Sequence, residues 1–365
     1  MDRPAQTVSV LEYTTYAVTA IIGNVLFVWP GHVVAAAGEN ALGSVGLILV
    51  CLVGSGLLHH QAIRQPAGQR AIRLILRGAT GAGLVLVGLV DLALVALLTQ
   101  MLHTLFYADT PRWALLLPFL PIMLWAGGIT LDALGRLTQL WVPLGGTVFA
   151  AIAAVGLIHA THLRPLWPQH WYVAPMIRGV GIMAYLLVPV GPTVVGLAPR
   201  VNATDRMARR GFLAAAGITG LTLLAVYGLV SMMLGPNAIP HLRWPLVYSL
   251  ETITLDSTFF ISRVGLAVIF LWTAVVALAF AVHLRLSLQW LTPRQVRPPV
   301  WLTGGIGMLY GLGLLAFPTP SASTHWILRT IDPVALGYLL MEHGLLLLVL
   351  LVEVLRRRRS QTGAP

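Results

Sequence analysis

Runs of about 20 apolar residues follow one another along the whole chain, separated by turn residues or by arginines. A helix of this length spans the roughly 30 Å hydrocarbon layer of a bilayer. The runs lack the alternation of membrane β-strands, and in lipid a helix satisfies its own backbone groups. Charged residues make up 10% of the 365 residues, against about 25% in soluble domains. The chain is therefore predicted to be a polytopic α-helical membrane protein.

Ten membrane-spanning helices are predicted, so both termini lie on the same side. They fall at about 10–30, 40–58, 79–105, 113–131, 140–160, 174–197, 212–234, 258–283, 301–318 and 334–354. All 23 basic residues are arginine; 17 fall on the side of the termini, 4 on the other side, and 2 within or at the edge of spans. Cytoplasmic loops retain positive charge. We therefore expect both termini in the cytoplasm and residues 355–365 to form a basic cytoplasmic tail, with no nucleic-acid partner despite the net charge of +11.

Two of the predicted spans contain residues that interrupt a helix. Residues 21–31 read IIGNVLFVWPG and residues 174–196 read APMIRGVGIMAYLLVPVGPTVVG; Gly and Pro are the least favourable residues of a helix interior. Broken helices in corresponding positions of two halves indicate an inverted-repeat transporter core. The alternative is that these residues are kinks or close-packing points, which are common in membrane helices.

The broken-helix interpretation predicts a LeuT-like fold with five helices in each of two halves. Because five is odd, the halves have opposite orientations in the membrane. Residues 1–365 form one membrane domain, with repeats at about 10–160 and 174–354 and with the first and sixth helices broken.

A helix that unwinds exposes backbone groups to a ligand, with the dipole ends of the half-helices pointing at it. The predicted ligand site comprises Gly23, Asn24, Val25, Asp91, Tyr185, Pro189, Gly191 and Thr273. Asp91 lies mid-span, where an ionisable residue costs roughly 2.5–3.5 kcal/mol. It could neutralise a ligand ammonium, take a proton, pair with a buried arginine, or act as a neutral hydrogen-bonding group between helices.

Other ionisable residues are weaker candidates. Glu12, Arg178 and Arg263 are candidates for gating or ion pairing; the alternatives are a solvated helix end for Glu12 and headgroup contacts for the two arginines. Glu342-His343 in the last span is a further candidate. The residues His159, His162 and His170 lack a carboxylate or thiolate cluster at ligand spacing, so no metal site is predicted. We find no catalytic triad or redox motif, and expect neither an enzyme nor a cofactor.

Three stretches carry a family resemblance. They are AIIGNVLFVWPGHVVAAAGENAL, YADTPRWALLLPFLPIMLWAGGITLDALGRLTQLWVPL and RWPLVYSLETITLDSTFFISRVGLAVIFLWTAVVALAF. Their order resembles the B-subunit family of spore-germination nutrient receptors (GerAB-type), a branch of the amino acid–polyamine–organocation transporter superfamily. Two positions depart from the family pattern: Ser262-Arg263 stands in place of Glu-Arg, and Pro192 stands where an acidic residue is often found.

The resemblance implies a transporter fold with a ligand pocket among spans 1, 3, 6 and 8. It also implies a germinant-binding subunit in the cell membrane or spore inner membrane, with A- and C-type receptor subunits as partners and amino acids or other small nutrients as ligands. The alternative is a self-sufficient secondary transporter that moves an amino acid with H⁺ or Na⁺.

Overall fold

The computed structural model describes residues 7–23, 29–64, 70–105, 109–111, 114–115, 119–158, 160, 168, 170–242, 244–251, 264–293, 297, 299–315 and 326–361. In these residues the chain is almost entirely helical. The helices, together with short 3₁₀ (η) and π (η6) segments, are α1 (Val10–Ile22), α2 (Trp29–Ala37), η1 (Gly38–Asn40), α3 (Ala41–Ile63), α4 (Arg70–Leu105), α6 (Phe119–Gly128), α7 (Leu131–Ile158), α8 (Val173–Ile182), η3 (Ala184–Leu187), α9 (Val190–Leu197), η4 (Ala198–Arg200), α10 (Asp205–Leu234), η5 (Ile239–His241), α11 (Pro245–Glu251), α12 (Val264–Leu291), α13 (Val300–Leu315), η6 (Ile327–Ile331) and α15 (Asp332–Gln361).

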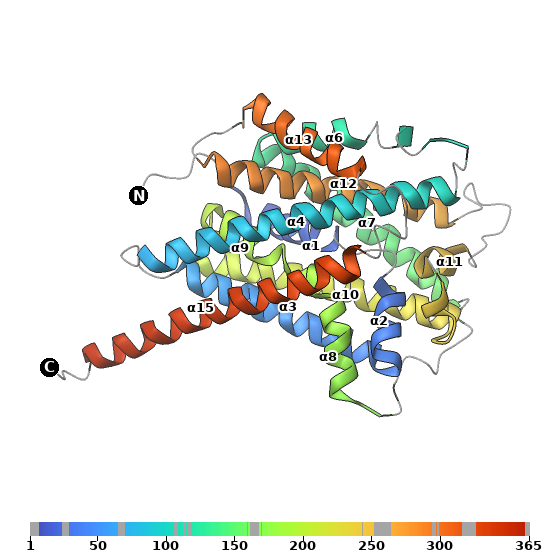
Figure 1. The fold of residues 1–365 in the computed structure, drawn as a ribbon, viewed down its shortest axis with the longest axis horizontal. Helices are drawn as coiled ribbons and strands as arrows, with labels where there is room; N and C mark the ends of the chain where they lie inside the picture. Colours follow the sequence, from blue (N-terminus) through green and yellow to red (C-terminus); the bar gives the residue numbers. More distant parts are fainter. Residues whose placement is uncertain are drawn as a thin grey trace.

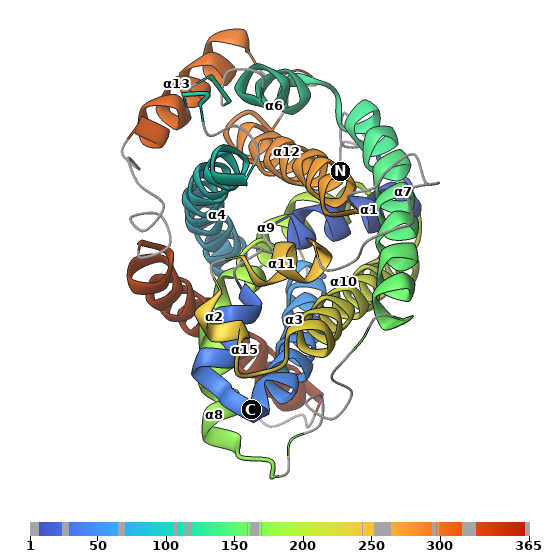
Figure 2. The ribbon, with the colours of Figure 1, turned by 90° about the vertical axis from the view of Figure 1, so that its right-hand side faces the viewer.

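The long helices lie side by side along one direction, while α2 and α8 run steeply across it (Figure 1). Seen from the end, α1, α3, α4, α10 and α12 surround the middle of the bundle, and α6 and α13 lie together outside α12 (Figure 2). The short helix α11 packs against α2, α10 and α12 at one end of the bundle.

Six helices of the described residues are long and apolar enough to cross a membrane, or seven if the bent pair formed by α8 and the η3–η4 segment is one span. They are Trp29–Ile63, Leu74–Thr104, Leu131–Ile158, Asp205–Leu234, Ile269–Leu291 and Arg329–Val352. Val10–Ile22 and Val300–Tyr310 are shorter apolar helices. These segments are typical of an integral membrane protein, and the count of ten crossings stays a prediction.

The first helix ends at the glycine that was expected to interrupt it. Helix α1 ends at Ile22 with Gly23 as its cap, and α2 begins at Trp29. Pro30 and Gly31, which were expected to end the first span, lie in the first turn of α2 instead. Proline is tolerated there because the N–H it lacks would have no helical partner in a first turn.

The second interruption is a bend of 62° between α8 and the segment Ala184–Arg200. The 3₁₀ turn η3 occupies the bend, and Pro189 precedes the first residue of α9. Helix α8 is held against its neighbours at its start, because the backbone N–H of Tyr172 donates to Asn40 Oδ1 at 2.8 Å and Ser44 Oγ donates to the carbonyl of Met176 at 3.0 Å.

The two interrupted segments run antiparallel beside each other. Helix α1 packs against α9, and α2 packs against α8, so the start of one segment meets the end of the other. The residues just outside the segments are joined as well. Val8 N donates to the carbonyl of Arg200 at 3.0 Å, and Asn202 N donates to the carbonyl of Val8 at 2.8 Å, which makes the isolated β-bridge between Val8 and Val201.

The apolar runs located the helices but placed several helix ends wrongly. Helices α4, α7 and α10 begin at Arg70, Leu131 and Asp205, about eight residues before the predicted spans, and α15 continues to Gln361 through most of the predicted tail. The physical reason is that a membrane helix extends beyond the hydrocarbon layer, where its polar end turns are solvated and leave no trace in the hydropathy.

Small residues let the helices approach closely. Gly56 of α3 is buried, and a Cβ added there would overlap the ring of Phe212 on α10, which is fully buried. Gly54 lies two residues earlier on the exposed face of the same helix, with nothing within 4 Å of an added Cβ. Substitutions of these two glycines therefore distinguish the effect of packing from the effect of helix propensity.

We predict that Gly56→Ala lowers the free energy of unfolding by about 1–3 kcal/mol, because overpacking a filled interface displaces its neighbours. Gly54→Ala is the matched control and is expected to be neutral or stabilising, since alanine favours a helix over glycine by roughly 1 kcal/mol. Equilibrium unfolding in mixed micelles, followed by circular dichroism, measures both. Equal effects of the two substitutions would contradict the close approach of α3 and α10.

Candidate functional site

The last turn of α1 carries the first element of the site, a carbonyl group released by the end of the helix. The final four carbonyls of a helix have no partner within it, and Ala20 lies in the last turn of α1. Its carbonyl oxygen lies 3.1 Å from Nε2 of His283, a residue of α12. The imidazole therefore satisfies a backbone group that the interruption of α1 leaves free.

The other nitrogen of the same imidazole faces Asp91 of α4. Nδ1 of His283 lies 2.9 Å from Oδ1 and 3.1 Å from Oδ2 of the carboxyl group. The two side chains are 2% and 3% exposed. Asp91, His283 and the Ala20 carbonyl thus join α4, α12 and α1 through a buried, continuous set of hydrogen bonds.

The acceptor at each end determines where the protons lie. A carbonyl oxygen can only accept, so Nε2 of His283 carries a hydrogen and donates to Ala20. The link between Nδ1 and Asp91 then holds one proton, which belongs either to an imidazolium facing a carboxylate or to a carboxylic acid facing a neutral imidazole. Both forms have no net charge. Pairing therefore reduces the free-energy cost of removing the acid and the base from water. The pair is chemically able to gain a proton or pass one on.

Helix α12 approaches the end of α1 very closely at this point. A Cβ added to Gly23 would overlap that of Ala279, which lies one helical turn before His283. Glycine at position 23 therefore allows α12 to bring His283 within hydrogen-bonding distance of α1.

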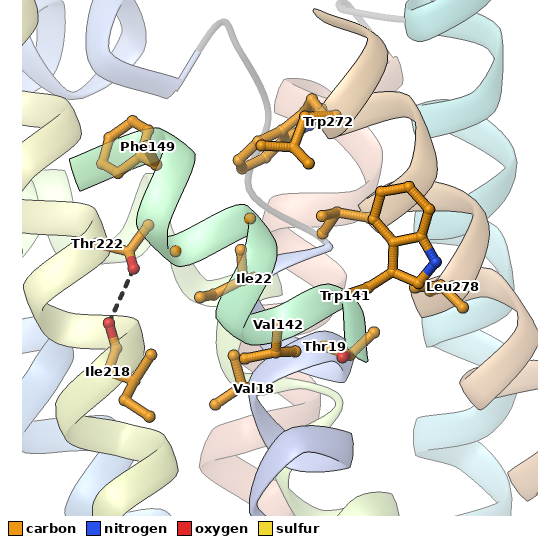
Figure 3. A pocket seen from close by; sticks show the side chains of 14 residues that line it. Val18, Thr19, Ile22, Trp141, Val142, Phe149, Ile218, Thr222, Trp272 and Leu278 are labelled. Atoms are coloured by element: carbon orange, nitrogen blue, oxygen red, sulfur yellow. Dashed lines mark hydrogen bonds between the residues drawn. The ribbon is translucent and has the colours of Figure 1, made fainter. Parts of the chain in front are cut away.

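A cavity opens beside the same stretch of α1, between α1, α7, α10 and α12 (Figure 3). Its lining residues are Val18, Thr19, Ile22, Trp141, Val142, Gly145, Gly146, Phe149, Ile218, Thr222, Leu271, Trp272, Val275 and Leu278. The two hydroxyl groups donate within their own helices, Thr19 to the carbonyl of Thr15 and Thr222 to that of Ile218, both within 2.9 Å. The walls are otherwise apolar and include the rings of Trp141 and Trp272, so the cavity suits an aliphatic or aromatic group.

The structure divides the residues that the sequence had assigned to one ligand site. Gly23 and Asp91 lie at the α1–α4–α12 junction, as described above. Tyr185 and Pro189 are buried in the bend between α8 and α9. Gly191 packs instead against the side chains of His59 and Glu342.

Three further assignments concern helix surfaces and ends. Thr273 donates to the carbonyl of Ile269 in its own helix, beside the cavity-lining Trp272. Arg178 is exposed on α8. Glu12 is 7% exposed, so it is not a solvated helix end; its carboxylate accepts from Ser9 N at 2.6 Å and caps α1.

Asn24, Val25 and Arg263 lie outside the described residues, as do Ser262, His159 and His162.

His283 is the candidate site residue that sequence reasoning missed. The predicted span 258–283 ended at this histidine, whereas α12 continues to Leu291 and encloses it. A single histidine within an apolar run indicates a candidate functional site, as the aspartate at position 91 does. Extending the predicted span 258–283 by two turns would have placed His283, like Asp91, within a predicted membrane helix.

The family of spore germination proteins matches residues 84–289, more than half of the chain. The chain belongs to this family. The matched region runs from within α4 to within α12 and contains both Asp91 and His283.

Solved structures show the fold that goes with this family. A mutant of the Eremococcus coleocola manganese transporter has 11% identity and a TM-score of 0.51, covering 94% of this chain and 80% of that chain. The inward-facing conformation of Mhp1 has 13% identity and a TM-score of 0.49, covering 94% and 77%. No curated protein matches the chain by sequence. The likeness to the manganese transporter shows that the chain shares the helical fold of that protein.

We predict that Asp91→Leu lowers the free energy of unfolding by about 1–3 kcal/mol, because it leaves Nδ1 of His283 buried without a partner. Asp91→Asn should cost less, since its amide can donate to Nδ1 of a neutral imidazole. Asp132→Leu is the control: Asp132 is exposed and pairs with Arg136 one turn away on α7, so the change should stay within about 0.5 kcal/mol. Unfolding by denaturant in micelles measures all three, and a tolerated leucine at position 91 would refute the pairing.

Proposed function

We propose that this chain is a nutrient receptor subunit of spore germination, which binds a small ligand such as an amino acid and signals to A- and C-type partner subunits. The observation that carries the proposal is the match to the spore germination family over residues 84–289, together with the interrupted helix at Ala20 in front of a buried acid–imidazole pair. In this proposal the chain crosses the membrane ten times, in two inverted halves, with both termini in the cytoplasm.

The antiparallel contact of the two interrupted segments supports the inverted halves. In two halves of opposite orientation, the leading helices run in opposite directions. Here α1 packs against α9 and α2 against α8, as that arrangement requires.

The end of α1 supports a ligand with a positively charged group. The carbonyl end of a helix carries partial negative charge and favours cations. In the structure, the Nε2–H group of His283 donates a hydrogen bond to the carbonyl of Ala20. An ammonium group arriving at this helix end competes with that imidazole, so ligand binding would change the proton and hydrogen-bond arrangement at Asp91.

The apolar cavity supports a ligand with an apolar side chain. It adjoins α1 through Val18, Thr19 and Ile22, in the same turns that contain Ala20. A nutrient bound at the end of α1 therefore has an apolar compartment next to its charged groups, walled by Trp141 and Trp272 (Figure 3).

Proton-coupled transport of an amino acid is the second candidate function. The observation in its favour is the Asp91–His283 pair, which holds one proton in a buried link and is directly bonded to an interrupted helix. A receptor and a transporter share the same ligand-dependent shift between conformations, and they differ in whether the ligand is released on the other side.

Two measurements on the purified full chain separate the candidates. For a receptor, a panel of single amino acids should include at least one that raises the thermal stability, by up to about 2.7 kcal/mol at 100 times its Kd, while proteoliposomes accumulate none of it under a pH or sodium gradient. Gradient-driven accumulation that Asp91→Asn abolishes establishes the transporter. No stabilisation and no uptake across the panel would reject an amino-acid ligand.

The cavity provides a paired test of where the ligand binds. We predict that Gly145→Leu fills the cavity and removes ligand-induced stabilisation, because an added Cβ meets only Leu271, at 3.8 Å and beyond. Gly217→Leu is the matched control on the exposed face of α10, where an added Cβ meets nothing within 4 Å. The control should retain the full thermal shift. Retention of the shift in Gly145→Leu would exclude the cavity from ligand binding.

A further inference from the structure

A second buried acid–imidazole pair lies where α3, α9 and α15 meet. Nε2 of His59 lies 3.1 Å from Oε1 of Glu342, and the two side chains are 1% and 2% exposed. The hydroxyl of Tyr338 donates to the same Oε1 at 2.7 Å. These residues take no part in the site at the end of α1. An acid at this depth in a membrane helix indicates a function by default.

The hydrogen positions follow from the backbone partner of the imidazole. Nδ1 of His59 lies 2.8 Å from the carbonyl of Ser55, which can only accept, so Nδ1 carries a hydrogen. The contact between Nε2 and Glu342 Oε1 then holds one proton and is electrically neutral overall. A further proton changes the pair to an imidazolium beside a carboxylic acid, with a net charge of +1.

The second carboxyl oxygen is where that further proton can bind. Among the described residues, Oε2 of Glu342 has no hydrogen-bond partner. Nδ1 of His343 is 3.9 Å from this oxygen and directs its hydrogen to the carbonyl of Leu339 at 2.8 Å. A carboxylate with one bare, buried oxygen is poorly solvated, and a proton bound there would give that oxygen a hydrogen while leaving the imidazolium charge uncompensated.

Helix α9 covers the atoms that would exchange the proton. A Cβ added to Gly191 would lie 2.8 Å from Glu342 Oε1 and 2.8 Å from His59 Nε2. The pair has almost no exposed surface, so a proton can reach it only when neighbouring backbone moves away. Helix α9 is one arm of the bent segment and lies directly against the pair through Gly191, so it is the element next to any change in the charge of the pair.

We propose that His59 and Glu342 form a proton-binding site, and that uptake of one proton there shifts the position of α9. The inference stands apart from the nutrient site, since it concerns different residues and a different ligand. One proton from the medium binds, no bond between heavy atoms changes, and the local charge rises by one.

The groups that face the pair come from each helix packed around it. They are His60, which neighbours His59 on α3, Tyr338 and His343 from α15, and the carbonyl of Ala79 from α4, which lies 3.0 Å from the Tyr338 hydroxyl and shares its one hydrogen with Glu342 Oε1. Helix α9 contributes no ionisable side chain, and Arg178 of α8 is exposed. The proton affinity is therefore that of the His59–Glu342 pair, with Tyr338 and His343 as the ionisable neighbours of the carboxyl group.

Infrared difference spectroscopy of the full chain in lipid vesicles tests proton binding directly. Stepping from about pH 9 to about pH 4, across the ordinary range of carboxyl and imidazole groups, should produce a carboxylic-acid C=O band that Glu342→Gln removes. Asp91→Asn is the control and should leave this band in place. A spectrum in which Glu342→Gln changes nothing would overturn the proposal.

Two further variants keep the test decisive if Glu342→Gln does not fold. Gly191→Ala should shift the pH midpoint of the band by about one unit, a tenfold change in proton affinity, because the methyl group separates Nε2 from Oε1. His59→Gln should also shift the midpoint, because it removes the imidazole. A pair that is only a structural hydrogen bond would show the same midpoint in all of these proteins, or no band at all.

Hydrogen–deuterium exchange of residues 190–197 tests the link to α9. At neutral pH, Glu342→Gln imitates the protonated acid, and the exchange rate of this segment should differ from wild type by at least severalfold. At acidic pH, after correction for intrinsic rates, the two proteins should converge. Equal exchange at both pH values would separate proton binding from any movement of α9 and refute that part of the proposal.

Discussion

A helix that ends within a buried, apolar part of a protein leaves carbonyl groups that water cannot reach, so the protein itself must supply their partners. At the end of α1 this partner is His283, and His283 in turn requires Asp91. The backbone determines this order. Because the carbonyl of Ala20 can only accept a hydrogen bond, the imidazole of His283 must donate from Nε2. The proton shared with Asp91 is a consequence of where α1 stops.

The two interrupted segments each contact one buried acid–imidazole pair. Asp91 and His283 lie against the end of α1, while His59 and Glu342 lie against α9 through Gly191. In both places a glycine allows the backbone to approach the pair closely. Small residues and helix interruptions thus act together, the first by giving space and the second by exposing polar groups. The apolar cavity adjoins the same turns of α1 through Val18, Thr19 and Ile22.

Much of this arrangement was predictable from the sequence. The rest could not be predicted, and the physical reasons can be given residue by residue. The apolar runs located the helices, and the Gly and Pro residues located the bend between α8 and α9. Asp91 was recognised because an acid in an apolar run is costly wherever it lies. Its partner is 192 positions away in the chain, and no local pattern reveals which distant residue a buried acid will meet. Gly191 was assigned to a ligand pocket because it lies in an interrupted helix. Its actual neighbours depend on how α3 and α15 pack, which the local sequence does not reveal.

The short bridge between Val8 and Val201 has a mechanical consequence. It fastens the strand-like residues before α1 to those after α9, so the two arms are tied at one end of the bundle. Separating them breaks two main-chain hydrogen bonds, a net cost of about 1–3 kcal/mol. The free energy that holds the two arms together at this end is therefore small beside that of a whole helix interface, so a change in the relative position of α1 and α9 is resisted mainly by side-chain packing.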